Sequence, residues 1–321
     1  MGNIRENKKL MQRFCKDYNL PINVFNGEMF SYYSELYDFF PKERWEKLCD
    51  KIEKEYDGNV QLWLDDCADV RDAAIFGVMT TEAYKAFNTC DMSKWNLDPN
   101  VPQVGEHSIY NNECVGHTFI SIDLKKANFQ ALKYAGVIDD DTYDSFISKY
   151  GGDDYIINSK YLRQVIFGKM NPGRTIKVEK YIMGKVYGLL HAMIEYLGFE
   201  FYSLNSDELI FKGKNIGEEY MPWSSHMKMF ADLVKDALGI DVRCECILVG
   251  KIDIVNANGN SVDAYVKYNV HTEEKTLKKA STTFFPQIYK IWKHLPIDKK
   301  DLVFFFEDQL ATFNEPLKEV L

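Results

Sequence analysis

The sequence lacks the features that mark exported and disulfide-stabilised proteins. Its 7 cysteines are an odd number without a CxxC pair, which favours reduced thiols over a disulfide framework or a zinc site. There is no run of about 18 apolar residues, and residues 1–20 are polar without an apolar signal-peptide core. We therefore expect a cytoplasmic protein with no membrane partner.

Proline and glycine are also scarce, with 9 and 19 residues among 321, and the chain has no internal repeat or low-complexity tract. This composition excludes disordered and collagen-like architectures. Hydrophobic residues, in contrast, make up 46% of the chain and include 21 Phe, 20 Tyr and 5 Trp. The protein can therefore bury a large core.

Charge is unevenly distributed along the chain. The formal net charge is −9, which by itself argues against a nucleic-acid partner. Residues 158–187 nevertheless carry seven basic side chains and one acid, Glu179, a local balance of +6. A solvated helix face is the simpler interpretation of this segment, and contact with phosphate groups is the alternative. The basic residues are Lys160, Arg163, Lys169, Arg174, Lys177, Lys180 and Lys185.

Residues 1–90 have the pattern of helices and contain no recognisable chemical motif. Their apolar spacing predicts helices over 4–17, 41–56 and 64–88. Residues 91–117 contain Pro99, Pro102 and Gly105 together with many Asn and Asp residues, so we expect a long connection there.

The pattern becomes more informative from Thr118. Residues 118–123 have the β-branched and aromatic content of a strand that ends in Asp123. Several helices, two short strands, another helix and a fourth strand follow, which is the order of a split βαβ, ferredoxin-like α+β fold. The predicted helices cover 125–134, 141–149, 159–167, 175–197 and 224–238, and the later strands cover 199–204, 209–212 and 241–248.

This topology brings acidic residues together. The first and third strands are neighbours in it, so Asp123 meets Asp207 and Glu208, which lie in the turn before the third strand. Adjacent carboxylates raise each other's pKa unless a cation lies between them. Mg²⁺ accepts such hard oxygen ligands, and two of these ions activate an attacking hydroxyl and stabilise a leaving pyrophosphate. A metal-free turn is the alternative, since Asn205-Ser206-Asp207 is favourable turn sequence.

Several segments resemble the palm motifs of reverse transcriptases. Asp123-Leu-Lys-Lys-Ala127-Asn128-Phe129-Gln130 resembles the first motif, in which a metal-binding Asp precedes Ala and an aromatic residue. Asn171-Pro172-Gly173-Arg174, ahead of a long helix, resembles the second motif, which supports the template and the incoming nucleotide. Asn205-Ser206-Asp207-Glu208 resembles the third motif, a turn with two acids. Helix 224–238 and Leu248-Val249-Gly250 resemble the following helix and primer-grip hairpin.

The resemblance implies a polymerase palm over residues 115–250. Helical fingers would come from residues 1–114 and the inserted segment 136–175. Residues 251–321 would form a small thumb-like region, with a hairpin at Asn258-Gly259 followed by helical pattern. The implied function is template-directed nucleotidyl transfer that uses Mg²⁺ or Mn²⁺, a nucleic-acid template and primer, and nucleoside triphosphates.

The resemblance and the residue chemistry together give candidate roles. Asp123, Asp207 and Glu208 are the expected catalytic and metal-binding residues. The candidates for contacts with triphosphate or template are mostly basic, because Lys and Arg neutralise phosphate. Tyr187 either stacks on a base or belongs to the core. The full candidate binding set is Lys125, Lys126, Asn128, Arg174, Lys177, Lys180 and Tyr187.

Two departures from the reverse-transcriptase pattern leave the substrate open. Ser206-Asp207-Glu208 stands where the third motif usually ends in two Asp residues, and Asn128 stands where an aromatic side chain would exclude a 2′-hydroxyl. An RNA-synthesising polymerase is therefore an alternative. Met183 and Tyr187-Gly188 also have a weaker resemblance to single-subunit RNA polymerases and family A DNA polymerases.

Two further alternatives belong to other functional classes. The palm could be catalytically silent and serve as a nucleic-acid-binding or assembly module, which the Glu in the third motif, the negative net charge and the short chain favour. A palm-type nucleotide cyclase is the other alternative, although the sequence contains no diagnostic cyclase motif.

Overall fold

The computed structural model describes residues 3–22, 26–102, 107–214, 224–306 and 309–320. Residues 103–106 of the predicted connection therefore lie outside the described residues. All seven cysteines are free, as expected. None of the helices among the described residues has both the length and the apolar character needed to cross a membrane.

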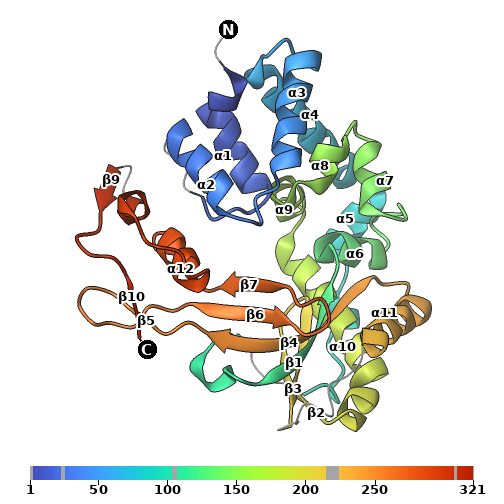
Figure 1. The fold of residues 1–321 in the computed structure, drawn as a ribbon. Helices are drawn as coiled ribbons and strands as arrows, with labels where there is room; N and C mark the ends of the chain where they lie inside the picture. Colours follow the sequence, from blue (N-terminus) through green and yellow to red (C-terminus); the bar gives the residue numbers. More distant parts are fainter. Residues whose placement is uncertain (1–2, 23–25, 103–106, 215–223, 307–308, 321) are drawn as a thin grey trace.

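A six-stranded antiparallel sheet is the centre of the fold (Figure 1). Its strand order is β2-β3-β1-β4-β6-β7, so β1 lies between β3 and β4, and the predicted pairing of the first and third strands is present. Together with the helices this makes the protein an α+β protein. The strands are β1 (Thr118–Leu124), β2 (Phe199–Leu204), β3 (Glu208–Gly213), β4 (Val242–Lys251), β6 (Tyr265–Asn269) and β7 (Lys275–Lys278).

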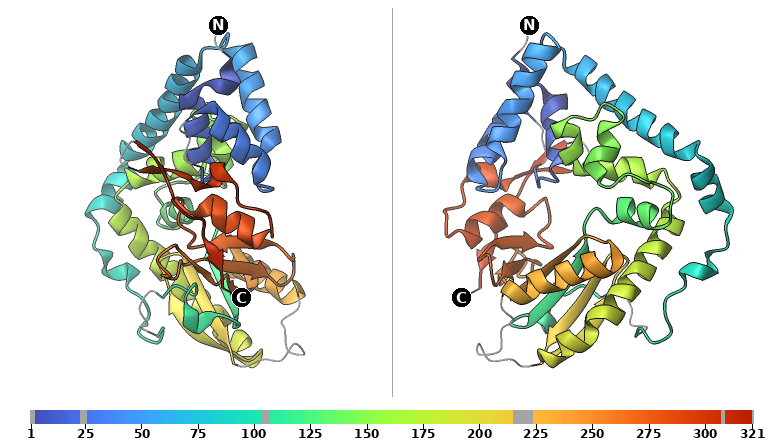
Figure 2. Two further views of the ribbon diagram at one scale, coloured as in Figure 1. Left: turned by 60° about the vertical axis from the view of Figure 1, so that its left-hand side comes forward. Right: turned by 90° about the vertical axis from the view of Figure 1, so that its right-hand side faces the viewer.

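Helices cover one face of this sheet. They are α6 (Ala127–Tyr134), α10 (Pro172–Tyr196) and α11 (Ser224–Leu238), and Figure 2 shows α10 and α11 lying along the sheet. Ile120 and Ile122 of β1 belong to the same buried cluster as Ile182 of α10 and Phe230 of α11. Because side chains alternate along a strand, the neighbouring residues of β1 belong to the opposite face, which we call the open face.

The open face has an apolar end and a polar end. Phe119 of β1 packs with Ile210 of β3 and with Val249 of β4 in a second, smaller cluster. Ile109 and Cys114, from the segment before β1, contribute to the same cluster. This packing anchors one end of the open face and leaves the end near Asp123 for polar side chains.

The remaining helices form a layer above the sheet in Figure 1. The helix predicted over 64–88 is two helices, because the first ends at Met79 with Thr80 as its C-cap, and Thr81 caps the next by accepting a hydrogen bond from the Tyr84 N–H. Helix α2 lies between the predicted helices 4–17 and 41–56, where none was expected. The helices are α1 (Lys8–Asp17), α2 (Gly27–Leu36), α3 (Lys42–Glu55), α4 (Val60–Met79), α5 (Glu82–Thr89), α7 (Tyr143–Ser148), α8 (Asp154–Asn158) and α9 (Lys160–Gly168).

The carboxyl-terminal part differs most from the sequence-based expectation. The hairpin predicted around Asn258-Gly259 is reduced to β5 (Ile254–Val255) and a single bridge between Val255 and Ser261, because β6 pairs with β4 instead. Strand β7 and the β8–β9 hairpin stand where only helical pattern was expected. The other elements are α12 (Phe285–Trp292), β8 (Val303–Phe306), β9 (Gln309–Thr312) and β10 (Lys318–Glu319).

Candidate active site

The three predicted acids lie together at one end of the sheet. Asp123 of β1 is paired in register with Glu208 of β3. Asp207 precedes Glu208 in the β2–β3 turn, and its carbonyl oxygen accepts a 2.8 Å hydrogen bond from the Leu124 N–H. The pairing of β1 with β3 therefore brings the acids together across a sequence separation of more than 80 residues.

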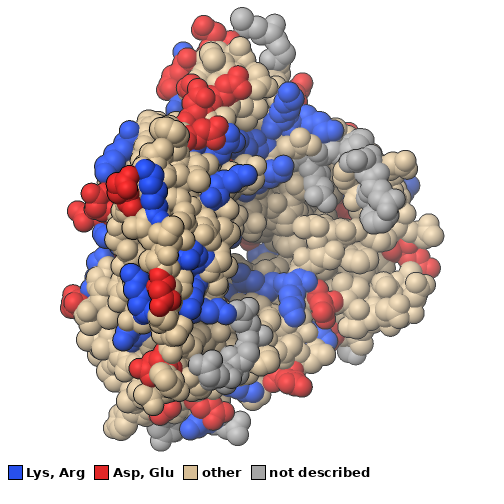
Figure 3. Space-filling model, turned by 180° about the vertical axis from the view of Figure 1, so that it is seen from behind, with Lys and Arg blue, Asp and Glu red and all other residues tan. Residues whose placement is uncertain are grey.

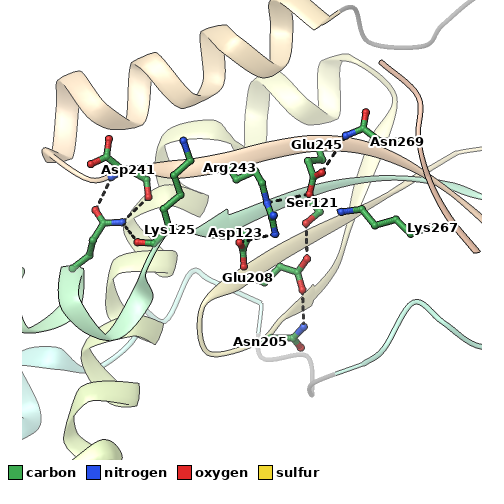
Figure 4. Close-up of polar contacts among 11 residues, drawn as sticks. Ser121, Asp123, Lys125, Asn205, Glu208, Asp241, Arg243, Glu245, Lys267 and Asn269 are labelled. Atoms are coloured by element: carbon green, nitrogen blue, oxygen red, sulfur yellow. Dashed lines mark hydrogen bonds and ion pairs between the residues drawn. The ribbon is translucent and has the colours of Figure 1, made fainter. Parts of the chain in front are cut away.

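Asp123 and Glu208 both lie on the open face (Figure 4). Glu208 is held there by its neighbours, because its Oε1 accepts a 2.5 Å hydrogen bond from the Ser121 hydroxyl and its Oε2 lies 3.5 Å from the Asn205 amide nitrogen. Ser121 occupies the position two residues before Asp123, so alternation places both side chains on one face. Ser121 thus orients the carboxylate of Glu208.

A basic residue that the sequence did not single out contacts Asp123. The guanidinium of Arg243, on β4, donates to Asp123 Oδ2 at 3.0 Å and lies 3.2 Å from Glu245 Oε2. Lys267 and Asn269 of β6 also donate to Glu245, at 2.7 and 3.1 Å. The open face therefore carries an alternating network of acids and bases from β3, β1, β4 and β6 (Figure 4).

The acidic side chains near Asp123 outnumber the basic side chains that offset their negative charge. Burial, together with the smaller effects of the Glu208 and Asp207 charges, raises the pKa of the Asp123 carboxyl to about 6 in spite of the opposing effect of Arg243. A carboxyl group in this state gains from an additional cation, because a positive charge within a few ångströms favours its ionised form.

Glu179 is a further acid that sequence reasoning placed in the basic segment and gave no role. It lies on α10 with only 2% of its surface exposed, and its Oε1 accepts a 2.6 Å hydrogen bond from the side-chain amide of Asn128. Burial, with a smaller effect from the charge of Asp207, raises the pKa of Glu179 to about 7 in spite of the hydrogen bond from Asn128. Its isolation among seven basic residues was the one signal in the sequence that set it apart.

A pocket of about 460 Å³ opens beside the acids on the open face. It brings acids, bases and the polar segment before β1 to one cavity, so a charged ligand can contact both signs of charge there. Its lining consists of His107, Ser108, Ile109, Tyr110, Asp123, Asn205, Glu208, Ile210, Arg243, Glu245, Ile247, Lys267 and Lys278.

The chemistry of the acids fits a hard divalent cation that also binds a substrate. The described ranges contain no group of three His, Cys, Asp or Glu residues placed to hold a metal on its own. Mg²⁺ is commonly held by one or two carboxylates together with substrate phosphates and waters. Asp123 of β1 and Asp207 of the β2–β3 turn are the expected carboxylates, and Arg243 donates to one oxygen of Asp123.

Arg174 and Lys177, two of the predicted basic residues, lie away from the acids. Arg174 donates to the Cys90 carbonyl oxygen and lies over the Phe87 ring, which ties the start of α10 to α5. Lys177 and Arg174 both lower the pKa of Asp91, although less than the hydrogen bonds from Ser93 do. These two residues therefore lie near the α5 end rather than near the acid pair. Lys180 makes an interaction with another residue.

The other candidates occupy two different environments. Lys125 and Lys126 line a separate pocket of about 260 Å³, and Lys126 forms an ion pair with Asp144. Asn128 contacts Glu179, as described above. Tyr187 is buried and stacks on His191 and Phe211, so the structure places it in the core beneath the sheet.

Comparison with protein-family models, curated proteins and solved structures finds no match for this chain.

Proposed function

We propose that the protein catalyses template-directed nucleotidyl transfer with Mg²⁺ or Mn²⁺, in the manner of a reverse transcriptase. The observation that carries this proposal is the pairing of Asp123 on β1 with Glu208 on β3, with Asp207 next to Glu208 in the turn. A bound metal would supply electrostatic stabilisation to a transferring phosphoryl group. The residues that would hold it are Asp123 and Asp207, with Glu208 beside them.

The order of the sheet supports a ferredoxin-like palm. Strands β2, β3, β1 and β4 are neighbours in that order, with α6 to α10 connecting β1 to β2 and α11 connecting β3 to β4. This is the strand order of a split βαβ unit. On this basis residues 115–250 act as the palm, residues 1–114 and 136–175 as fingers, and residues 251–321 as a thumb-like region.

The protein's own side chains would prepare the site for substrate. Arg243 holds Asp123 at the pocket until a stronger cation competes for the same oxygen. Ser121 fixes the rotamer of Glu208. The Asn128 amide is fixed by its hydrogen bond to Glu179, so a polar side chain stands where an aromatic one would exclude a 2′-hydroxyl. This supports an RNA-synthesising polymerase as the alternative.

A catalytically silent nucleic-acid-binding module is the second candidate. The contacts of Arg243 with Asp123 and of Ser121 with Glu208 favour it, because they satisfy both acids without a metal. It predicts nucleic-acid binding that is unaffected by a chelator.

A primer-extension assay separates these functions. Purified protein is given labelled primer on DNA or RNA template, dNTPs or NTPs, and Mg²⁺ or Mn²⁺, with EDTA as the control. We expect incorporation that depends on template and metal, and the preferred triphosphate identifies the polymerase class. Binding of primer and template without incorporation under any condition would support the silent module instead. Turnover of a nucleotide without template would indicate a cyclase.

A further inference from the structure

The elements of the protein form a closed circuit of contacts. Helix α1 joins α9 through the buried carboxylate of Asp17, which accepts hydrogen bonds from Tyr155 and Ser159 at 2.7 and 2.5 Å. Helix α9 leads into α10, which packs on β2 and β3, and the sheet continues to β7. After β7 the chain enters α12, which returns to α2. The right-hand view of Figure 2 shows this circuit as a ring.

The last link of the circuit is a clasp between α2 and the carboxyl-terminal region. Its polar part is centred on Asp301, which is completely buried and accepts a 2.7 Å hydrogen bond from the Tyr32 hydroxyl. Lys290 of α12 forms a 2.7 Å ion pair with the same carboxylate. Lys300 contacts Glu28 at 2.9 Å on the outside of the clasp. A buried charge pair with a satisfied partner is costly to separate.

Aromatic packing completes the clasp. Tyr37, at the end of α2, is 1% exposed and contacts the rings of Phe285 and Tyr289 of α12 at centroid distances of 5.3 and 4.9 Å. The Asp38 N–H donates to the Tyr289 hydroxyl, and Lys293 donates to the Asp38 carboxylate at 2.6 Å. These buried contacts join α2 to α12, so the ring is closed in this structure.

Positive charge gathers inside the circuit. Figure 3 shows a hollow in the rear face with Lys and Arg side chains around it. Burial lowers the pKa of Lys278 on β7, as do the nearby charges of Lys267, Arg243 and Lys160, whereas Glu245 opposes this effect. Lys160 begins α9, on the fingers side of the circuit, whereas the other three residues lie on the sheet. Cations from opposite sides of the ring therefore approach one another, an arrangement that a polyanion between them would stabilise.

We infer that the ring encloses a single polynucleotide strand, held by its phosphates between the α9 side and the β4–β7 side of the circuit. The inference rests on the proposed function for the identity of the polyanion, and it adds a topological mode of binding. Phosphate groups between the two sides would place negative charge between Lys160 of α9 and Lys278 of β7.

A second pocket supports a single strand over a duplex. It has a volume of about 570 Å³ and lies between β8 and two elements of the circuit, α1 and α9. Lys16, Tyr161 and Phe305 contribute to its lining. Cations combined with aromatic rings are typical of single-strand sites, because unpaired bases stack on the rings while the backbone contacts the charges.

Cross-linking the clasp tests this inference. The Glu28→Cys/Lys300→Cys variant is treated with a bismaleimide reagent that spans the original ion pair, whose side chains are mostly exposed. Binding is then measured with linear single-stranded DNA, the same sequence as a closed circle, and linear duplex. We expect the cross-linked protein to bind the linear strand at least about tenfold more tightly than the circle. A ring that cannot open admits only a strand with an end.

Matched controls separate the possible failures. Glu82→Cys/Lys85→Cys carries the same reagent across an exposed ion pair within α5, where cross-linking closes no ring. Wild-type protein treated with reagent controls for the native cysteines. Equal affinity of the cross-linked clasp variant for circle and linear strand, or a preference for duplex, would overturn the ring inference and leave the proposed function standing. If untreated protein binds no nucleic acid at all, the proposed function fails, and the inference fails with it.

Discussion

The two faces of the central sheet are built from the same strands but bury different chemistry. On the face covered by α6, α10 and α11, Ile120, Ile122 and Phe211 are fully buried in the largest apolar cluster. On the open face, β1 presents Phe119, then Ser121, then Asp123. A single strand, β1, therefore contributes both to the apolar core and to the charged site. Its covered residues supply stability, and its open residues become polar only toward one end.

The largest effect is expected from placing a charge on the covered face. Ile122→Asp should unfold the protein, because an unpaired buried carboxylate costs several kcal/mol, roughly 3–5 kcal/mol by comparison with broken buried ion pairs. Circular dichroism during urea denaturation measures this loss. Ile122→Val is the matched control and should cost only about 1 kcal/mol. A folded Ile122→Asp protein of wild-type stability would contradict the assignment of faces.

Removing a charge from the open face should affect activity and not folding. Asp123→Asn should lower nucleotide incorporation by about a hundredfold or more, because it removes electrostatic stabilisation of the transferring group. Its free energy of unfolding should be unchanged or higher, because burial disfavours the Asp123 charge. Primer extension and urea denaturation measure the two quantities. Asp241→Asn is the control, since Asp241 lies on the same sheet edge and its carboxylate pairs with Lys235. Incorporation by Asp123→Asn at the wild-type rate would reject a catalytic role for Asp123.

A pH series tests how the buried acid Glu179 of α10, on the covered side of the sheet, contributes to the free energy of unfolding. Its pKa is raised from 4.5 to about 7 in the folded protein, so the folded state binds more protons than the unfolded state in that window. The contribution of Glu179 to stability is therefore greatest below about pH 4.5 and is lost as the pH rises through about 7. Glu179→Gln should remove this loss, roughly 1–3 kcal/mol across the window.

The measurement for Glu179 is urea denaturation at several pH values. Glu195→Gln lies on the same helix at an exposed position and is the matched control. If Glu179→Gln shows the same decline in stability between about pH 5 and about pH 8 as the wild type, the decline comes from other groups.

The smallest effect is expected from the cations of the open face. Lys278→Gln should reduce the slope of log affinity against log salt concentration by about 0.7 for single-stranded DNA, the value for one phosphate contact. Fluorescence anisotropy at several salt concentrations measures the slope. Lys275→Gln, at an exposed position on the same strand β7, should leave it unchanged. Equal slopes for the two variants would place the nucleic acid elsewhere.

The sequence predicted local elements well where the signal was local. Strand β1 and the strands of the β2–β3 hairpin were predicted within about two residues, because their β-branched and aromatic content is short-range information. The pairing of β6 with β4 was not predicted, since the Asn258-Gly259 turn signal reports on neighbours in sequence and not on distant strands. Strand partners are decided by tertiary packing.

The same distinction explains the candidate site. Asp123 and Glu208 came together because strand order and register determine their place, and Asp207 precedes Glu208 in the turn. Arg243 was missed, because an Arg at the start of a strand has no sequence signal for a partner 120 positions earlier. Arg174 was expected near phosphate, but the rotation of α10 turns its side chain toward Cys90 of α5. The charge of a segment predicts its composition and not the direction of its side chains.

The clasp between α2 and α12 also has a consequence for biosynthesis. Tyr32 and Asp301 are 269 positions apart, so the amino-terminal helices leave the ribosome long before their partner is made. Contacts at such separation form late, because the ordering of the intervening chain must come first. The nascent protein therefore passes through an open form that exposes Tyr32 and Tyr37 of the clasp until α12 and Asp301 have been translated.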